Sequence, residues 1–351
     1  MNDSMIFEND IQYIHSCGFI DLDKLNDKTI LITGATGLIG YSVITALLEY
    51  DLRHSCNISI IAVVRDIEKA EKMYDGYLGG HLRFIVSDIT NVFSVEGKVD
   101  HIIHGASLTS SKEFVSKPVD TIRTAVNGTM NMLELAREKQ AESFVYLSSM
   151  EVYGAPATDD KITEESPTDL NTMSVRTSYP ESKRICEAMC CAYNSQYGVS
   201  TKVVRLTQTF GPGVSYDDTR VFADFARCVI ESRDIVLHTK GETRRNYLYT
   251  ADAVTAILAV LLSGQGGEAY NAANEDTYCS IYEMAELAAS LSESGKTSVR
   301  TELQDASSFG YAPTLKMNLD TSKLQKLGWS AVTDLKEMFS GLIAYMKAVR
   351  S

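Results

Sequence analysis

The chain has 351 residues, 44% of them hydrophobic, which is enough to bury a core in two lobes. Its net charge of −13 argues against nucleic acid or an anionic membrane surface as a partner. The acidic start MNDSMIFEND does not resemble a secretory signal, and the longest apolar run, 256–262, is too short to span a bilayer. Seven cysteines without a CxxC motif favour reduced thiols and no metal site. We therefore expect a soluble cytoplasmic protein.

From residue 28 onward, short apolar segments of strand character alternate with helical patterns, after a helical extension over 1–27. The strand candidates are 28–34, 59–64, 83–88, 101–106, 143–149 and 201–206. The helix candidates are 38–50, 66–75, 119–140 and 179–197. This alternation predicts an α/β fold with a Rossmann-type doubly wound parallel sheet.

The alternation fades after about residue 210, and the pattern becomes mixed. We expect a dinucleotide-binding domain over 28–207, to which 240–263 returns. Segments 208–239 and 264–351 would then form a smaller mixed α/β lobe that binds the substrate.

The first strand leads into three glycines and then an apolar helix, in KTILITGATGLIGYSVITALLEY. Gly34 permits a sharp turn, Gly37 lets backbone amides approach a pyrophosphate, and Gly40 lets the helix pack closely on the strand. Because the trio lies between a strand and a helix, it predicts dinucleotide binding rather than an ordinary turn.

The ends of the next strands offer further contacts to the cofactor. Asp66, after the second strand, would favour NAD by binding the ribose hydroxyls, whereas Arg65 beside it would accept the 2′-phosphate of NADP. A solvated Arg–Asp pair is the alternative. Asp88 ends the third strand and is a candidate partner for the adenine amino group. The remaining candidates at these turns are Thr36, Leu38, Ile39, Ile89 and Ala106.

The stretch RTSYPESKRICEAMC carries a tyrosine and a lysine four residues apart. Ser178 and Glu181 match a capping box, so a helix should begin near Tyr179 and place Tyr179 and Lys183 on one face. A phenol is a poor base at neutral pH, but a neighbouring ammonium and a bound nicotinamide both stabilise the phenolate. The pair is therefore a candidate reaction centre that also contacts the cofactor. Ser148 or Ser149, at the end of a strand, could donate a hydrogen bond to a substrate oxygen.

The chain resembles a known family, the extended short-chain dehydrogenases/reductases that act on nucleotide sugars as epimerases, dehydratases and decarboxylases. The matching segments are TGATGLIG, HGAS, AVNGTMNMLE, LSSMEVYG, SYPESK, RLTQTFGPG, RRNYLYTADAV, AYNAAN and LGW, in the family's order. The resemblance implies a tightly held nicotinamide cofactor and a C-terminal lobe that binds a nucleoside diphosphate sugar. It also implies a homodimer formed through the helix of Tyr179. Ser149 matches the catalytic Ser/Thr, Ser148 would support it, and Asn127 would support the active-site water and the lysine.

The shared chemistry of this family is oxidation at the sugar C4 hydroxyl. The 4,6-dehydratases have Thr-Asp-Glu where this chain has Ser149-Met150-Glu151. Methionine cannot donate a proton, so ordinary dehydration is disfavoured, while Glu151 indicates additional proton chemistry at C5 or C6. UDP-glucuronate decarboxylases resemble the chain more closely, with Ser/Thr-Ser-Glu-Val-Tyr-Gly, although Met150 departs from their serine. A 4-epimerase or an atypical dehydratase is the alternative.

Four arginines follow from the same resemblance as contacts to the substrate. Arg176 and Arg184 match the Arg-x-x-Tyr-x-x-x-Lys-Arg run of the decarboxylases and could hold a C6 carboxylate; the alternative is that both are surface charges. Arg220 and Arg244 match positions that contact the diphosphate or nucleoside, with Arg245 a less secure candidate. A non-catalytic dinucleotide sensor is the hypothesis of another class, which would have no use for Ser149, Tyr179 and Lys183 together.

Overall fold

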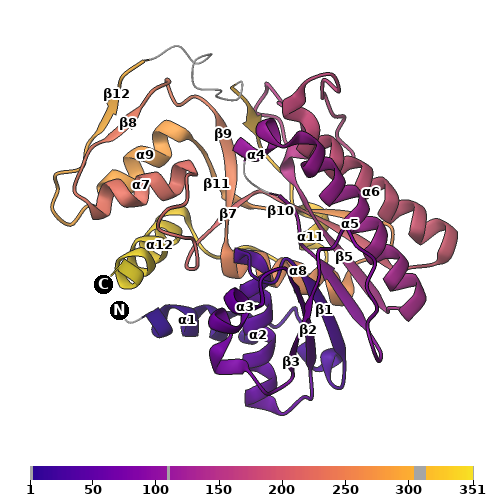
Figure 1. Ribbon diagram of the computed structural model, residues 1–351. Coiled ribbons are helices and arrows are strands. Elements are labelled where there is room, and N and C mark those ends of the chain that lie inside the picture. The colour runs from indigo at the N-terminus through magenta and orange to yellow at the C-terminus, as the bar shows by residue number, and fades with distance from the viewer. Residues whose placement is uncertain (1–2, 109–110, 304–313, 351) are drawn as a thin grey trace.

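The computed structural model describes residues 3–108, 111–303 and 314–350, and at its centre is a sheet of seven parallel strands (Figure 1). From one edge to the other, the strands are β10 (Ala269–Ala272), β6 (Thr201–Leu206), β5 (Ser143–Ser149), β4 (His101–His104), β1 (Thr29–Thr33), β2 (Ser59–Val64) and β3 (Leu82–Val86). The six strands expected from the sequence are all present in this sheet. The predicted Rossmann-type doubly wound fold is therefore confirmed.

Helices cover both faces of the main sheet, as buried apolar strands require. One face packs against α2 (Leu38–His54), α3 (Ile67–Met73) and α8 (Thr250–Ser263). The other packs against α5 (Pro118–Lys139) and α6 (Ser178–Tyr197), the pair with the most extensive helix–helix contact. Because all seven strands are parallel, their carboxyl ends meet at one edge of the sheet.

A second, smaller part of the chain is built around β9 (Arg244–Tyr249). It pairs with β7 (Gln208–Phe210), β11 (Asn274–Ser280) and β13 (Lys316–Met317). A separate parallel pair joins β8 (Ile235–Leu237) to β12 (Val299–Thr301), with α7 (Val221–Ile230), α9 (Ile281–Ser290) and α12 (Leu335–Arg350) beside them. The sequence assignment of 264–351 to this part was wrong for β10, because α8 carries the chain back to pair with β6 in the main sheet.

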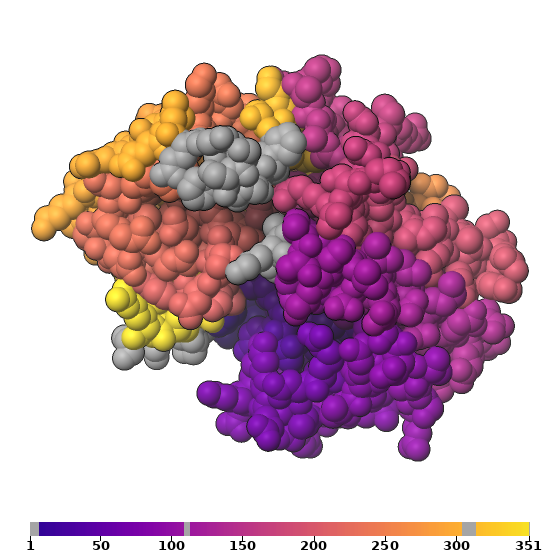
Figure 2. Space-filling model, turned by 45° about the horizontal axis from the view of Figure 1, so that its top comes forward, coloured from indigo at the N-terminus to yellow at the C-terminus, as the bar shows by residue number. Residues whose placement is uncertain are grey.

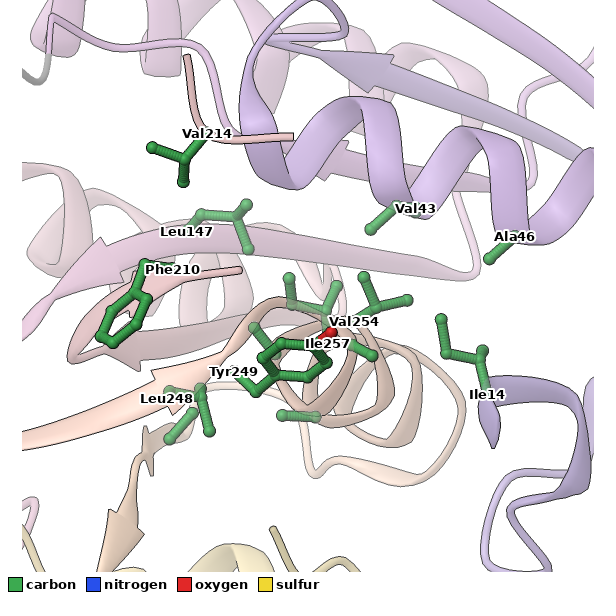
Figure 3. Close-up of a cluster of buried hydrophobic side chains, with 14 of the residues drawn as sticks. Ile14, Val43, Ala46, Leu147, Phe210, Val214, Leu248, Tyr249, Val254 and Ile257 are labelled. Atoms are coloured by element: carbon green, nitrogen blue, oxygen red, sulfur yellow. The ribbon is translucent and has the colours of Figure 1, made fainter. Parts of the chain in front are cut away.

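The amino-terminal helix α1 (Asp3–Ser16) packs against α2, α8 and α12, and so touches both parts of the molecule. Figure 3 shows Ile14 of this helix facing the same apolar cluster as Val43 of α2, Ile257 of α8 and Leu248 of β9. Because one buried cluster runs through both parts, the second part is fixed against the main sheet by packing and does not depend on a linker alone.

The remaining short elements lie mostly at the carboxyl edge of the main sheet or beside it. They are η1 (Leu22–Leu25), η2 (Asp75–Tyr77), α4 (Ser111–Ser116), η3 (Met150–Tyr153), η4 (Val175–Thr177) and α11 (Ser322–Gln325). Within the described ranges, no helix combines the length and apolar character needed to cross a bilayer. All seven cysteines are free thiols. In Figure 2 a recess opens between the salmon-coloured second part and the purple part of the molecule, with indigo chain at its floor.

Candidate active site

The glycine turn joins β1 to α2 at the carboxyl edge of the sheet, and its spacing is dictated by close backbone contacts. Gly34 has a φ of +75°, and a Cβ there would lie 2.9 Å from the amide nitrogen of Ala106 after β4. A Cβ on Gly40 would lie 2.3 Å from the carbonyl oxygen of Gly34. Neither position can carry a side chain without moving backbone atoms. The first turn of α2 carries no acidic residue, and its N-cap, Gly37, offers no side-chain cap.

The ends of β1 and β4 are fastened to each other beneath this turn. The hydroxyl of Thr33 accepts a hydrogen bond from the Ala106 amide at 3.1 Å and is 2.7 Å from Nδ1 of His104. His104 is fully buried, and burial lowers the pKa of its imidazole to about 3, so the ring is neutral. The phenol of Tyr74 donates to the carbonyl oxygen of Ala35 at 2.7 Å. The backbone of the turn is thus held from both sides.

The residues expected to bind the adenosine lie along the next strand ends. Arg65 and Asp66 are both exposed after β2, and Asp66 caps α3 by accepting from the Lys69 amide at 3.0 Å. Asp88 accepts from the amide and hydroxyl of Thr90 at 2.8 and 2.7 Å, and these bonds hold the pKa of its carboxyl below the usual value. The charge of Arg65 contributes to the same lowering.

These residues fit NAD. A turn with glycine at its first and last positions, followed by a helix start without a side-chain cap, leaves backbone donors and a positive helix end for a pyrophosphate. The residues that would hold it there are Gly34, Thr36, Gly37, Leu38, Ile39 and Gly40. Asp66 and Asp88 offer carboxylates for the ribose hydroxyls and the adenine amino group, and Ile89 and Ala106 line the same edge. Among the described residues, no group of three or more metal-binding side chains is present.

Tyr179 lies in the first turn of α6, with only 7% of its surface exposed. Its ring stacks on Phe114 of α4 at 4.2 Å between centroids and an angle of 8°. Burial and the Glu151 carboxylate raise the pKa of the phenol, and a hydrogen bond with the Ser149 side chain lowers it. The net shift is upward. In the protein alone, desolvation is the largest influence on this phenol, and the predicted effect of the ammonium together with a bound nicotinamide stays a prediction.

The start of α6 also corrects one detail of the sequence analysis. Ser178 is already helical, with φ −52° and ψ −38°, and its hydroxyl donates to the carbonyl oxygen of Phe114 at 3.0 Å. The predicted capping box between Ser178 and Glu181 is therefore wrong. A capping box with both of its hydrogen bonds occurs instead at α9, between Ser280 and Glu283.

Lys183 lies one turn further along α6, on the same face as Tyr179. Its Nζ donates to the carbonyl oxygen of Leu147 at 2.7 Å and lies 4.7 Å from the ring centroid of Tyr146 and 5.6 Å from that of Tyr179. Burial lowers the pKa of this amine to about 8. The predicted supporting residue Asn127 is exposed on α5. Its supporting role stays a prediction.

Glu151, in η3, completes the group around Tyr179. Burial raises the pKa of its carboxyl, while the charges of Arg245 and Arg176 lower it. Its amide is bonded to the Ser149 hydroxyl at 3.3 Å. Glu151 and Tyr179 are close enough for the carboxylate to raise the pKa of the phenol. We refer to Ser149, Glu151, Arg176, Tyr179, Lys183 and Arg245 as the Tyr179 cluster.

The two adjacent arginines of β9 point to opposite faces of the strand, as alternation demands. Arg245 donates from Nη1 to Gln208 at 3.0 Å, and its buried Nε has no hydrogen-bond partner among the described residues. Arg244 instead faces acidic side chains, with Nη1 3.2 Å from Glu283 and Nε 3.9 Å from Asp159. Sequence reasoning ranked Arg244 above Arg245, whereas Arg245 is the one whose charge lowers the pKa of Glu151.

The remaining predicted arginines lie apart from the Tyr179 cluster. Arg220 is exposed at the start of α7 and forms a bidentate pair with Asp218, at 2.6 Å between Nη2 and Oδ2. Arg184 bonds to the hydroxyl of Thr168 and lines a cavity of about 320 Å³ between α6 and strands β6 and β10. None of Ser149, Glu151 or Tyr179 lines that cavity. The charge of Arg176 acts on Glu151, whereas Arg184 lines this separate cavity, and its predicted role as a substrate contact stays a prediction.

The two residues next to Ser149 have different surroundings. Ser148 donates to Oε1 of Glu187 at 2.6 Å and is buried, consistent with a supporting position. Met150 is buried with Met317 and Leu319, and its sulfur accepts from the Thr207 hydroxyl at 3.2 Å. Met150 therefore fills an apolar cluster behind the loop. The residue after it, Glu151, is the one whose charge is felt by Tyr179.

Comparison with known proteins agrees with this geometry. The model of the NAD dependent epimerase/dehydratase family matches residues 30–273, which is well over half of the chain. The chain belongs to this family. The predicted family and NAD as its cofactor are thereby confirmed, and the Tyr179 cluster lies at the sheet edge of a fold from a family of enzymes.

Curated relatives are similar to the chain in sequence, and solved structures are similar to it in fold. UDP-glucuronic acid decarboxylase 1 of Xenopus tropicalis is 32% identical over 93% of this chain and 74% of its own length. UDP-glucuronic acid decarboxylase 6 of Arabidopsis thaliana is 29% identical over 89% and 87%. In fold, the chain is similar to a dTDP-glucose 4,6-dehydratase of Streptomyces venezuelae solved with NAD and TYD (TM-score 0.77, 21% identity, 92% of this chain and 98% of that one). It is also similar to a UDP-glucose 4-epimerase of Thermotoga maritima (TM-score 0.76, 20% identity, 92% and 100%).

Proposed function

We propose that this chain oxidises a nucleotide sugar transiently at C4 and that its substrate is UDP-glucuronate, which it decarboxylates. The observation that supports this most is the place of Glu151, whose amide is bonded to the Ser149 hydroxyl and whose buried carboxyl feels the charges of Arg245 and Arg176. With Glu151 protonated, as its raised pKa favours, the two guanidinium groups leave positive charge that a C6 carboxylate would partly balance. The relatives named UDP-glucuronic acid decarboxylase favour the same substrate.

In the proposed reaction, the phenolate of Tyr179 takes the proton of the C4 hydroxyl while Ser149 holds the same oxygen by a hydrogen bond. When bound, NAD accepts the C4 hydride and later returns it, and its positive ring favours the phenolate. The resulting 4-keto sugar is a β-keto acid. Its C5–C6 bond breaks, carbon dioxide leaves, and the electron pair moves toward the C4 carbonyl. Glu151, whose raised pKa suits it to carry a proton, then protonates C5, and Tyr179 returns its proton to the C4 oxygen.

Arg220 and Arg244 are proposed to bind the diphosphate or nucleoside, with segments 208–239 and 264–351 supplying the rest of the nucleotide-sugar site. Both arginines are now paired with carboxylates, Arg220 with Asp218 and Arg244 with Glu283. A doubly negative ligand would exchange these exposed pairs for its own oxygens, which costs little because exposed ion pairs are weak.

A second copy of the chain is the proposed partner. Exposed apolar side chains lie along the outer sides of the two helices, Val119, Ile122 and Met130 on α5 and Ile185 on α6. Burying them in a homodimer would remove this apolar surface from water. We also propose a cytoplasmic location, supported by the seven free thiols.

The test begins with the purified protein, whose cofactor is released by denaturation and identified by mass. The protein is then incubated with UDP-glucuronate and, separately, with UDP-glucose, and the products are weighed by mass spectrometry. Loss of the mass of carbon dioxide from UDP-glucuronate supports the proposal. An unchanged mass with altered retention favours a 4-epimerase, and loss of water favours an atypical dehydratase.

Tyr179→Phe separates catalysis from binding. We expect it to abolish turnover, about 10³-fold or more, with NAD still bound. Tyr193→Phe on the outer part of the same helix, where the phenol bonds to Glu134, is the matched control and should retain activity. A protein that binds NAD but converts no nucleotide sugar, with or without Tyr179, would be a sensor and not an enzyme.

A further inference from the structure

Behind the Tyr179 cluster lies an ion pair that the proposed chemistry does not use. Glu187 is on α6 and Arg205 is on β6, and only 12% and 14% of their side chains are exposed. Nη2 of Arg205 is 2.6 Å from Oε2 of Glu187, and Nε is 3.0 and 3.2 Å from the two oxygens. A fork-shaped pair of this kind is strong and directional, because both groups are planar and largely removed from water.

Each member of the pair also binds a segment that carries a residue of the cluster. Oε1 of Glu187 accepts from the Ser148 hydroxyl at 2.6 Å, immediately before Ser149. Nη1 of Arg205 donates to the phenol oxygen of Tyr153 at 2.8 Å, and the guanidinium lies 5.0 Å from the centroid of that ring. Tyr153 ends η3, the single turn that contains Glu151. The pair therefore connects the end of β5 to the turn that holds the carboxyl group.

The same arginine and tyrosine reach further into the loop that follows. Arg205 donates to the carbonyl oxygen of Glu164 at 2.9 Å, and the Tyr153 phenol donates to Oδ1 of Asn271 at 2.7 Å. The backbone amide of Asn271 in turn donates to Oε1 of Glu164 at 2.6 Å. Every polar group of the network thus has a partner, which is the condition under which a buried network fixes one geometry.

Spacing along α6 explains why the pair controls position. Tyr179, Lys183 and Glu187 are four residues apart and lie on one face of the helix. They bind three consecutive residues at the end of β5: Tyr179 the Ser149 side chain, Lys183 the Leu147 carbonyl and Glu187 the Ser148 hydroxyl. The contact of Glu187 therefore sets the register of α6 against β5, two turns away from the reacting phenol.

We propose that Glu187 and Arg205 are positioning residues that hold Glu151 in a fixed place relative to Tyr179 without touching the substrate. This inference rests on the proposed function, since it needs Glu151 to act after the oxidation at C4, for which Tyr179 takes the hydroxyl proton. A displacement of about 1 Å in a reacting group costs on the order of 100-fold in rate. Loosening the pair therefore slows the steps that depend on Glu151 more than it weakens binding.

The test uses Glu187→Gln and Arg205→Lys in the full chain with its bound cofactor. Glu187→Gln keeps the acceptor for Ser148 and removes the charge that pairs with Arg205. We expect kcat on UDP-glucuronate to fall about 10- to 100-fold, with KM and NAD content close to wild type. Reduced nicotinamide should accumulate during turnover, because oxidation at C4 continues while protonation at C5 is slowed. Lys28→Gln, which breaks the pair with Glu142 at the other end of the sheet, is the control.

Several results would overturn the inference. It fails if kcat is unchanged, or if kcat, NAD content and melting temperature fall together without accumulation of reduced nicotinamide. Should a single variant not fold, the double variant Glu187→Leu, Arg205→Met removes both charges at once and leaves no unpaired ion. That variant must fold and still lose kcat. If the wild type converts a different nucleotide sugar, the proposed function fails. The ratio of kcat between variant and wild type on that sugar then tests the positioning role.

Discussion

The glycine turn and the arginines of β9 both serve a ligand, yet they are specified in different ways. At the turn, Gly34 and Gly40 are required by backbone atoms of the chain itself, 2.9 and 2.3 Å from where a Cβ would be. In β9, Arg244 and Arg245 are chemically identical neighbours on opposite faces of the strand, and Arg244 pairs with Glu283 whereas Arg245 bonds to Gln208. Spacing in the sequence reveals the first kind of site, whereas the second kind needs the tertiary structure.

The largest expected effect is at the backbone-specified site. Gly40→Ala places a methyl group against the Gly34 carbonyl, and the helix start must move. We expect a loss of about 3 kcal/mol in the free energy of unfolding and protein that purifies without NAD. Thermal melting and cofactor content check both. Gly76→Ala, at a position with open space within 4 Å, is the control and should change neither. Full cofactor content in Gly40→Ala would break the comparison.

The next effect separates the two arginines. Arg245→Met should lower kcat/KM about 100-fold, or about 3 kcal/mol, because it removes one of two cations near Glu151. Arg244→Met removes a charge already paired with Glu283 and should cost less than about 10-fold. Steady-state kinetics on one nucleotide sugar gives both values. Equal losses would mean that the face of the strand does not decide the role.

The smallest effect extends the comparison to Asp10 of α1, whose behaviour depends on packing alone. Burial and the nearby Asp252 raise the pKa of its carboxyl from 3.8 to about 7, while the hydrogen bond from the Tyr249 phenol at 3.3 Å lowers it. The folded state therefore binds this proton more tightly, so the stability it contributes is full below about pH 4 and is lost as the pH rises through about 7. Asp10→Asn should remove roughly 2 kcal/mol of this pH dependence. If the change in melting temperature between low and neutral pH is the same for the wild type and for Asp10→Asn, the prediction is contradicted.

The fold followed from the sequence wherever one local rule was enough. The six apolar segments became six parallel strands, because a strand buried on both faces leaves no other arrangement with crossover helices. The strand β10 escaped notice, since AYNA is short and its place depends on pairing with β6. The pattern at Ser178 and Glu181 predicted a cap, but α4 brings the Phe114 carbonyl to that hydroxyl, and a neighbour so distant in sequence gives no local sign.

The site divides along the same line. The sequence indicated Ser149, Glu151, Tyr179 and Lys183, which the structure gathers at one edge of the sheet. It did not indicate Phe114 under the tyrosine. Directions of side chains on long helices depend on which face the rest of the chain covers, and that is settled only by packing.

The contact between α1 and α12 ties the beginning of the described chain to its end. During synthesis, α12 leaves the ribosome long after α1, so the packing of α1 against α12 forms only late in synthesis. Phe7 shows this in miniature: its ring packs edge-on against Tyr41 of α2 at 6.1 Å and against Tyr345 of α12 at 5.6 Å. Nascent chains stalled before α12 should therefore leave α1 accessible to proteases, and chains that include α12 should protect it.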